Sequence, residues 1–436
     1  ARRTRDLWAG SFLLSWLSGH AMKAVTDRNG QILSPAVADD PLYNALHKRR
    51  VAGETAWPLI GSLPNRFSAE LPDGVAARVV EEAVLAAWEK LANAVWQVFF
   101  QDIANPKTAE IWDRQVKGFW QVAWAFETAD PKLDVLSARK HWRTTALPRD
   151  EEGDHCTIMG DLQELSGFTR ARREGNSQDA FWDAVRDKIT EVIYSSGKEA
   201  GTLELRRSER LCAIAFVKRA FPLLRLKYLE DAIGWVPDRP YEWTGGVDRE
   251  SDHQARCELR KYPSTAYMAA VPWMLRALDA DADECVAYCR QVKLVWPDAA
   301  PGLLTRAERY SAVKSLAETP FGHLDGTLLF EEGIARRRTE MRSNRQIAED
   351  GEADHVRGLT KALKALQTAT APTGGRRQRK MTKASPFYAV LLMDGDRIGN
   401  LLSEHGARVS PALVTFTGRV RDIVRKIGRA SCRERV

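Results

Sequence analysis

The sequence predicts an α+β fold in several parts, on the basis of three features. Strand-like segments alternate with two long helical segments over residues 1–145. Residues 146–367 show mainly helical periodicity, and a continuous apolar segment typical of a buried strand begins at Phe387. Between these parts, residues 368–386 are rich in Thr, Pro, Gly and Arg and are expected to form a linker. The 436 residues are enough for two to four domains with cores of their own.

The first part is expected to combine two long helices with several strands. Apolar residues at helical spacing predict the helices over residues 6–25 and 75–100. Strands are expected at residues 31–33 and within 58–71, and the alternating aromatic residues of 119–126 are typical of a half-buried strand. This order of elements fits a ferredoxin-like domain.

The middle part is expected to be mostly helical. Ser264 or Thr265 is a suitable N-cap for one of its helices. Residues 331–364 are highly charged and are expected to form a solvated helical arm. The clearest helical patterns occupy residues 203–221, 264–278, 283–292 and 305–317.

The net charge of +7 permits contact with RNA or DNA phosphates but does not require it, since excess Lys and Arg often only solvate a surface. The final ten residues, 427–436, resemble a translated sequencing adapter and are expected to be an artefact. They contain three Arg and one Glu, so the charge without them is +5. The basic segment 376–380 is expected to be solvated, and phosphate contact is the alternative interpretation.

The six cysteines are scattered, which favours a reducing cytoplasm over secretion. Residues 7–25 are apolar enough to suggest a signal peptide or membrane anchor. Ser, Gly, His and Lys interrupt them, however, so an amphipathic buried helix is expected and no membrane span is predicted.

Two carboxylates follow the buried strand of residues 387–393. Asp394, Gly395 and Asp396 form a tight turn, and a helix is expected to begin at Arg397. Carboxylates in this position can hold a hard divalent cation, and the N–H groups of the helix can receive phosphates that the cation bridges. The alternative is that Asp394 and Asp396 only form the turn and cap the helix.

The stretch 388–403 resembles the start of the second palm (cyclase-like) domain in the large subunit of type III-B CRISPR effector complexes, the Cmr-type, Cas-ten-like family. Four further stretches resemble the same family in the same order. Residues 5–15 and 62–67 resemble parts of its first palm domain, and residues 210–219 and 263–266 resemble parts of its helical middle. The resemblance therefore covers nearly the whole chain. It implies a first palm at 1–145, whose first strand would lie before residue 1, and the start of a second palm at 387–426.

The resemblance implies an ATP site with Mg²⁺ or Mn²⁺. Asp394 would be a metal ligand, and Asp396 would either ligate metal or cap the helix, so both are the expected catalytic residues. The expected nucleotide-binding residues are Gly395, Asp396, Arg397, Ile398 and Gly399. Two metal ions at such a site align an attacking 3′-hydroxyl with an α-phosphate. The family completes the site with a Gly-Gly-Asp-Asp hairpin, which would lie beyond residue 436.

The helical middle of this family often carries a zinc site made of two Cys-x-x-Cys pairs. The matching stretches here begin at Cys156 and Cys212, and each pair lacks its second cysteine: Met159 and Ala215 take those places. Tetrahedral zinc needs four ligands. We therefore expect Cys156 and Cys212 to be remnants of a degenerate zinc-finger region, with zinc absent and packing in its place.

The expected function is that of a large subunit in an RNA-guided antiviral ribonucleoprotein of the cytoplasm. The intact protein would bind ATP and metal between two palms and make cyclic oligoadenylates when target RNA is bound, whereas this stretch alone would be inactive. Its expected partners are other Cmr-type subunits, guide RNA, target RNA and single-stranded DNA. No His-Asp nuclease pair occurs in the sequence. The alternatives are a non-catalytic scaffold subunit of the same complex and a palm-type nucleotidyl cyclase unrelated to CRISPR.

Overall fold

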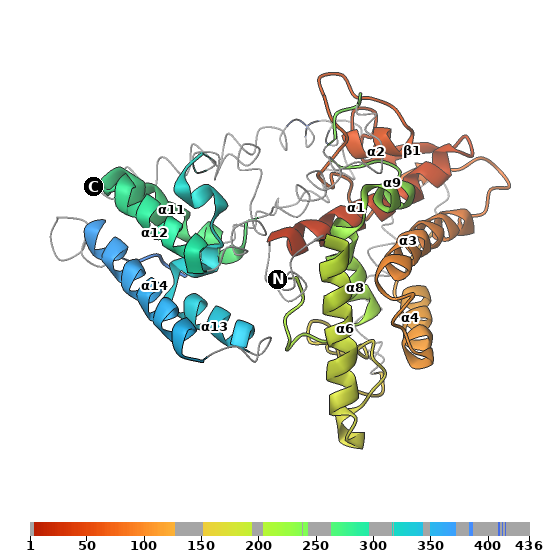
Figure 1. Ribbon diagram of the computed structural model, residues 1–436. Helices are drawn as coiled ribbons and strands as arrows, with labels where there is room; N and C mark the ends of the chain where they lie inside the picture. Colours follow the sequence, from red (N-terminus) through yellow and green to blue (C-terminus); the bar gives the residue numbers. More distant parts are fainter. Residues whose placement is uncertain are drawn as a thin grey trace.

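The chain folds mainly as helices, gathered in two groups (Figure 1). The computed structural model describes residues 4–126, 151–193, 204–237, 239–242, 263–295, 318–342, 349–371 and 383–386, together with 316, 409, 412 and 415.

The first group contains a two-stranded sheet and most of the helices, and its core is the larger. Its elements are α1 (Thr4–Thr26), β1 (Gln31–Ser34), α2 (Pro41–Leu46), β2 (Ser68–Glu70), α3 (Arg78–Phe99), α4 (Pro106–Gly118), η2 (Arg170–Arg172), α6 (Gly175–Ile193), α8 (Ala213–Ala220), η3 (Phe221–Leu223) and α9 (Leu226–Ile233).

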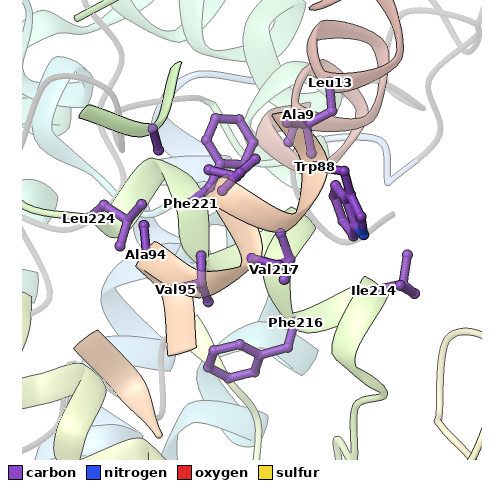
Figure 2. Close-up of a cluster of buried hydrophobic side chains, with 14 of the residues drawn as sticks. Ala9, Leu13, Trp88, Ala94, Val95, Ile214, Phe216, Val217, Phe221 and Leu224 are labelled. Carbon is purple, nitrogen blue, oxygen red and sulfur yellow. The ribbon is translucent and has the colours of Figure 1, made fainter. Parts of the chain in front are cut away.

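Helix α1 lies at the centre of this group and packs most extensively on α3. Phe12 and Trp16 are fully buried, and the Trp16 Nε1 atom donates a hydrogen bond to the carbonyl of Ile233 at 3.2 Å. Side chains from α1, α3, α8 and η3 meet in the core that Figure 2 shows, where Ala9, Trp88 and Phe221 are among the labelled residues.

The close approach of α1 to α2 depends on Gly19. A Cβ atom at this position would collide with the side chain of Leu46 and press on that of Leu63. Glycine therefore lets α2 and the residue 63 loop lie directly against the helix.

The predicted ferredoxin-like domain is wrong. Such a domain needs four strands, but the described part of residues 1–145 has only β1 and β2, an antiparallel pair with a register shift between Ile32 and Ser34. The alternating segment 119–126 forms no strand there, and Phe126 is 62% exposed. A strand needs a neighbouring edge to bond with, and here the neighbours are helices: Trp120 packs edge-on against Trp88 of α3.

The fold is therefore mostly helical where an α+β fold was expected. The predicted second ferredoxin-like domain, residues 387–426, lies outside the described residues except for three isolated positions.

Several individual elements match their predictions. The helices expected at 6–25 and 75–100 are confirmed as α1 and α3, and the strand at 31–33 is confirmed as β1. The helix expected at 203–221 is wrong in its first half because α8 begins only at Ala213. A turn precedes it, in which the Glu209 carboxylate accepts a hydrogen bond from the N–H of Arg206 at 2.7 Å.

The second group has its own core of buried side chains. Tyr288 anchors it, with its hydroxyl donating to the carbonyl of Leu328 at 2.5 Å. Ser264 caps the first helix by accepting from the N–H of Tyr267, which confirms the predicted cap. The elements are α11 (Thr265–Ala280), α12 (Ala282–Val295), η6 (Pro320–His323), η7 (Gly326–Leu329), α13 (Glu331–Arg342) and α14 (Glu349–Ala369).

Two cysteines of α12, Cys285 and Cys289, lie in this second core. Burial raises the pKa of each thiol to about 12. Both thiols are therefore protonated and unreactive at neutral pH. Within the described ranges, every helix is too short or too polar to span a bilayer.

Phe12→Ala should destabilise the first group by about 3–5 kcal/mol, the usual cost of deleting a buried aromatic ring. The matched control is Leu7→Ala on the same helix, which removes a side chain that is 53% exposed and should cost no more than about 0.5 kcal/mol. Urea unfolding followed by circular dichroism measures both. Equal effects of the two substitutions would contradict the central position of α1.

His20 on α1 should make the protein less stable as the pH falls. Burial, assisted by Lys23 and Lys90, lowers its pKa to about 4. In the unfolded chain, His20 binds a proton at about pH 6.5. As the pH falls below this value, protonation stabilises the unfolded state while His20 in the folded state stays neutral, so the free energy of unfolding decreases. His20→Gln should reduce the loss of unfolding free energy between pH 7 and pH 5 by up to about 2 kcal/mol. Urea unfolding at the two pH values tests this, and an unchanged pH dependence would refute it.

Candidate functional site

The predicted metal and nucleotide site, Asp394 to Gly399, lies outside the described residues. The roles of its residues therefore stay predictions. The other predicted residues, Cys156 and Cys212, are described, and the structure brings them together although they are 56 positions apart in the sequence.

Backbone hydrogen bonds join the two cysteine turns. His155 and Gln163 form an antiparallel bridge, and the N–H of Cys156 donates to the carbonyl of Leu162 at 2.8 Å. This small hairpin bonds to the segment before α8, since the N–H of Thr157 donates to the carbonyl of Arg210 at 2.8 Å. The two turns are thus held side by side by main-chain atoms, independently of their side chains.

Three sulfur atoms, those of Cys156, Met159 and Cys212, meet between the turns and form what we call the three-sulfur cluster. The Cys212 Sγ atom lies 3.8 Å from the Met159 Sδ atom, and the Cys212 thiol also donates a hydrogen bond to Cys156. Both cysteines are buried, and Met159 is partly exposed.

Backbone N–H groups point at these sulfur atoms. The Cys156 Sγ atom accepts from the N–H groups of Ile158 and Met159, each at 3.4 Å. The Cys212 Sγ atom accepts from the N–H of Ala215 at 3.5 Å and so caps the N-terminus of α8. Each sulfur occupies the place that a Ser or Asp oxygen usually takes at a turn or a helix start.

Gln115 of α4 ties the same two turns together. Its Oε1 atom accepts from the N–H of Ala213 at 2.8 Å, and its Nε2 atom donates to the Glu151 carboxylate at 2.7 Å and to the carbonyl of Gln163 at 2.8 Å. One buried amide side chain therefore links α4, the hairpin and the start of α8.

The two thiols differ strongly in acidity. The hydrogen bond from Cys212 lowers the pKa of Cys156 to about 6, against the effect of burial, and backbone N–H groups add to the lowering. The same contact, together with burial, raises the pKa of Cys212. The contact between them therefore favours the thiolate on Cys156 and the thiol on Cys212.

These residues do not fit a tetrahedral zinc ion. Beside the two thiols, the cluster offers only the thioether of Met159, and Ala215, whose N–H bonds Cys212, has no donor atom in its side chain. Among the described residues, no group of three or more His, Cys, Asp or Glu side chains is placed to hold a metal.

Glu164, next to this site, was not predicted from the sequence. Its buried carboxylate accepts from Trp182 Nε1 at 2.6 Å and from Gln178 Nε2 at 3.3 Å. Burial raises its pKa, and these hydrogen bonds together with those from Ser166 oppose the increase. No sequence pattern marks Glu164 or Gln115, because their partners come from distant segments that only the tertiary fold brings near.

Comparison with protein families matches residues 1–93 to the family described as CRISPR-associated protein Cmr2, N-terminal. No curated protein gives a match. Among the solved chains that match is one in "Type III-B Cmr-beta Cryo-EM structure of the Apo state", with 15% identity and a TM-score of 0.36. The match covers 80% of this chain and 41% of that one, and its TM-score is too low to define a shared fold.

The matched region holds the helices α1 and α2 and most of α3. Residues 1–93 are therefore similar to the N-terminal region of Cmr2, a CRISPR-associated protein. The resemblance noted in the sequence is confirmed over residues 1–93, where two of its stretches, 5–15 and 62–67, lie.

Cys212→Ala should raise the pKa of Cys156 from about 6 toward its ordinary range, because the substitution removes the hydrogen bond that favours the thiolate. The measurement is a pH titration of ultraviolet thiolate absorbance in a Cys285→Ser/Cys289→Ser background. That background should leave the transition near pH 6 intact, and Cys156→Ser should abolish it. A transition near pH 6 that survives Cys212→Ala would contradict the described geometry.

Proposed function

We propose that this chain is part of the large subunit of a type III-B CRISPR effector complex, and that the intact protein makes cyclic oligoadenylates from ATP. The observation that carries the proposal is the match of residues 1–93 to the Cmr2 family. The motif of residues 388–403, which resembles the same family, supports it from the other end of the chain.

The proposed chemistry takes place at residues 394–399. Asp394 would hold Mg²⁺ or Mn²⁺, with Asp396 as a second ligand or as a helix cap. The N–H groups of residues 396–399 would receive the ATP triphosphate, because the start of a helix favours anions. The metal would supply charge stabilisation for the attack of a 3′-hydroxyl on an α-phosphate.

The proposed partners are the other Cmr-type subunits, guide RNA and target RNA, in the cytoplasm. Binding of target RNA would switch on synthesis. The net charge of +7 is compatible with a protein that lies close to nucleic acid. The match to the Cmr2 family favours this assignment over a nucleotidyl cyclase unrelated to CRISPR.

Asp394→Ala in the reconstituted full-length complex should reduce oligoadenylate synthesis by about 100-fold or more, a loss comparable with removing one electrostatic stabiliser of a transition state. The control is Asp73→Ala, which removes an exposed carboxylate from a turn before α3 and should leave synthesis unchanged. Products from ATP are measured with target RNA present.

Binding of target RNA by the Asp394→Ala complex separates the two candidate functions. Normal RNA binding with lost synthesis supports a catalytic subunit. Normal RNA binding together with synthesis that Asp394→Ala does not reduce would rule out the metal role of Asp394. A complex that binds target RNA but makes no oligoadenylate even with Asp394 present would indicate a scaffold subunit instead.

A further inference from the structure

We propose that the three-sulfur cluster of Cys156, Met159 and Cys212 binds a soft monovalent cation, Cu(I). Two thiols and a thioether converge there, with the Cys212 Sγ atom 3.8 Å from the Met159 Sδ atom. Thiolate and thioether sulfur are ligands that Cu(I) selects, whereas Mg²⁺ and Ca²⁺ require oxygen. The site is separate from residues 394–399, so it does not depend on the proposed nucleotide chemistry.

The number of ligands favours Cu(I) over zinc. Structural zinc takes four ligands in a tetrahedron, and the cluster offers three sulfur atoms. Ala215, whose N–H bonds the Cys212 sulfur, is buried and has no donor atom in its side chain. Three sulfur ligands satisfy Cu(I), a d¹⁰ ion that accepts trigonal coordination.

The surrounding backbone suits the charge of such a complex. Two thiolates and one Cu(I) ion carry a net charge of −1. The N–H groups of Ile158 and Met159 point at Cys156, and that of Ala215 points at Cys212. Cys212 also stands at the N-terminus of α8, where the helix dipole favours negative charge. These donors would hold the sulfur ligands in place in the way that hydrogen bonds around metal sites orient their ligands.

The cluster is buried but close to solvent. Cys156 is 3% exposed and Cys212 fully buried, whereas Met159 is partly exposed and its neighbour Ile158 is 52% exposed. The thioether is therefore the first sulfur that an incoming ion meets. Two Cu–S bonds to the cysteines form as each thiol still protonated releases its proton to solvent. Copper remains monovalent, so no electron is transferred.

The experiment is an anaerobic titration of the reduced chain with Cu(I), supplied as its acetonitrile complex, in competition with a colorimetric Cu(I) chelator. One Cu(I) ion per chain should be withdrawn from the chelator. Cys156→Ser and Cys212→Ser should each weaken the affinity by about 100-fold or more, and Met159→Leu by about 10-fold, since even indirect changes at metal sites cost 10–100-fold. Met159→Leu keeps an apolar side chain of similar size, so it removes the sulfur with little change in packing.

The matched control is Cys285→Ser/Cys289→Ser, which removes the two thiols of the second core and should leave the Cu(I) affinity unchanged. Circular dichroism of each variant confirms that it folds. A Zn(II) titration under the same conditions should show weaker binding than Cu(I). Cu(I) affinity that survives Cys156→Ser, or that is the same in Met159→Leu as in the parent chain, would overturn the assignment, as would equal affinity for Zn(II).

Discussion

Buried ion pairs attach the first turn of α1 to segments about 200 residues away, and the position of the three-sulfur cluster depends on them. Arg5 bonds Glu204 at 2.6 Å, and both side chains are almost fully buried. Arg219 of α8 bonds Asp6 at 3.2 Å and Glu209 at 2.8 Å. Removing one partner from a buried pair typically costs 3–5 kcal/mol, because a charge is left without compensation. These contacts therefore fix where α8 lies on α1.

The position of α8 in turn places Cys212, the residue at its N-cap. The segment before α8 bonds to the hairpin of residues 155–163, and Cys156 therefore lies beside Cys212. Gln115 adds a third support from α4, which packs on both α3 and α8. The region matched to the Cmr2 family and the sulfur cluster are thus parts of one hydrophobic core.

The sequence predicted best where a single helix face decides the structure. The apolar periodicity of α1 and α3 and the cap at Ser264 depend on neighbours within one or two turns, so they could be read directly. The alternating aromatic residues of 119–126 led to a wrong prediction of a strand, because this spacing gives a strand only where the edge of a neighbouring strand is available. Likewise, the apolar residues of 205–212 are buried without being helical, because main-chain atoms of this segment bond across to Thr157 and Leu165. Cys156 and Cys212 were identified through a family resemblance, whereas Gln115 and Glu164 left no local signal.

The hydrogen bonds to sulfur give Cys156 and Cys212 a structural role of their own. In a turn such as that of residues 156–159, and at the start of α8, N–H groups would be buried without acceptors. The Cys156 and Cys212 sulfur atoms accept them. Met159 and Ala215 donate these hydrogen bonds through their main-chain N–H groups, which any residue except proline could supply. The side chains of Met159 and Ala215 could therefore change while the fold kept its turns, whereas replacing Cys156 or Cys212 with an apolar residue would leave N–H groups unpaired. The cluster therefore offers a thioether beside two thiols, a set of three ligands that suits the proposed Cu(I) ion better than tetrahedral zinc.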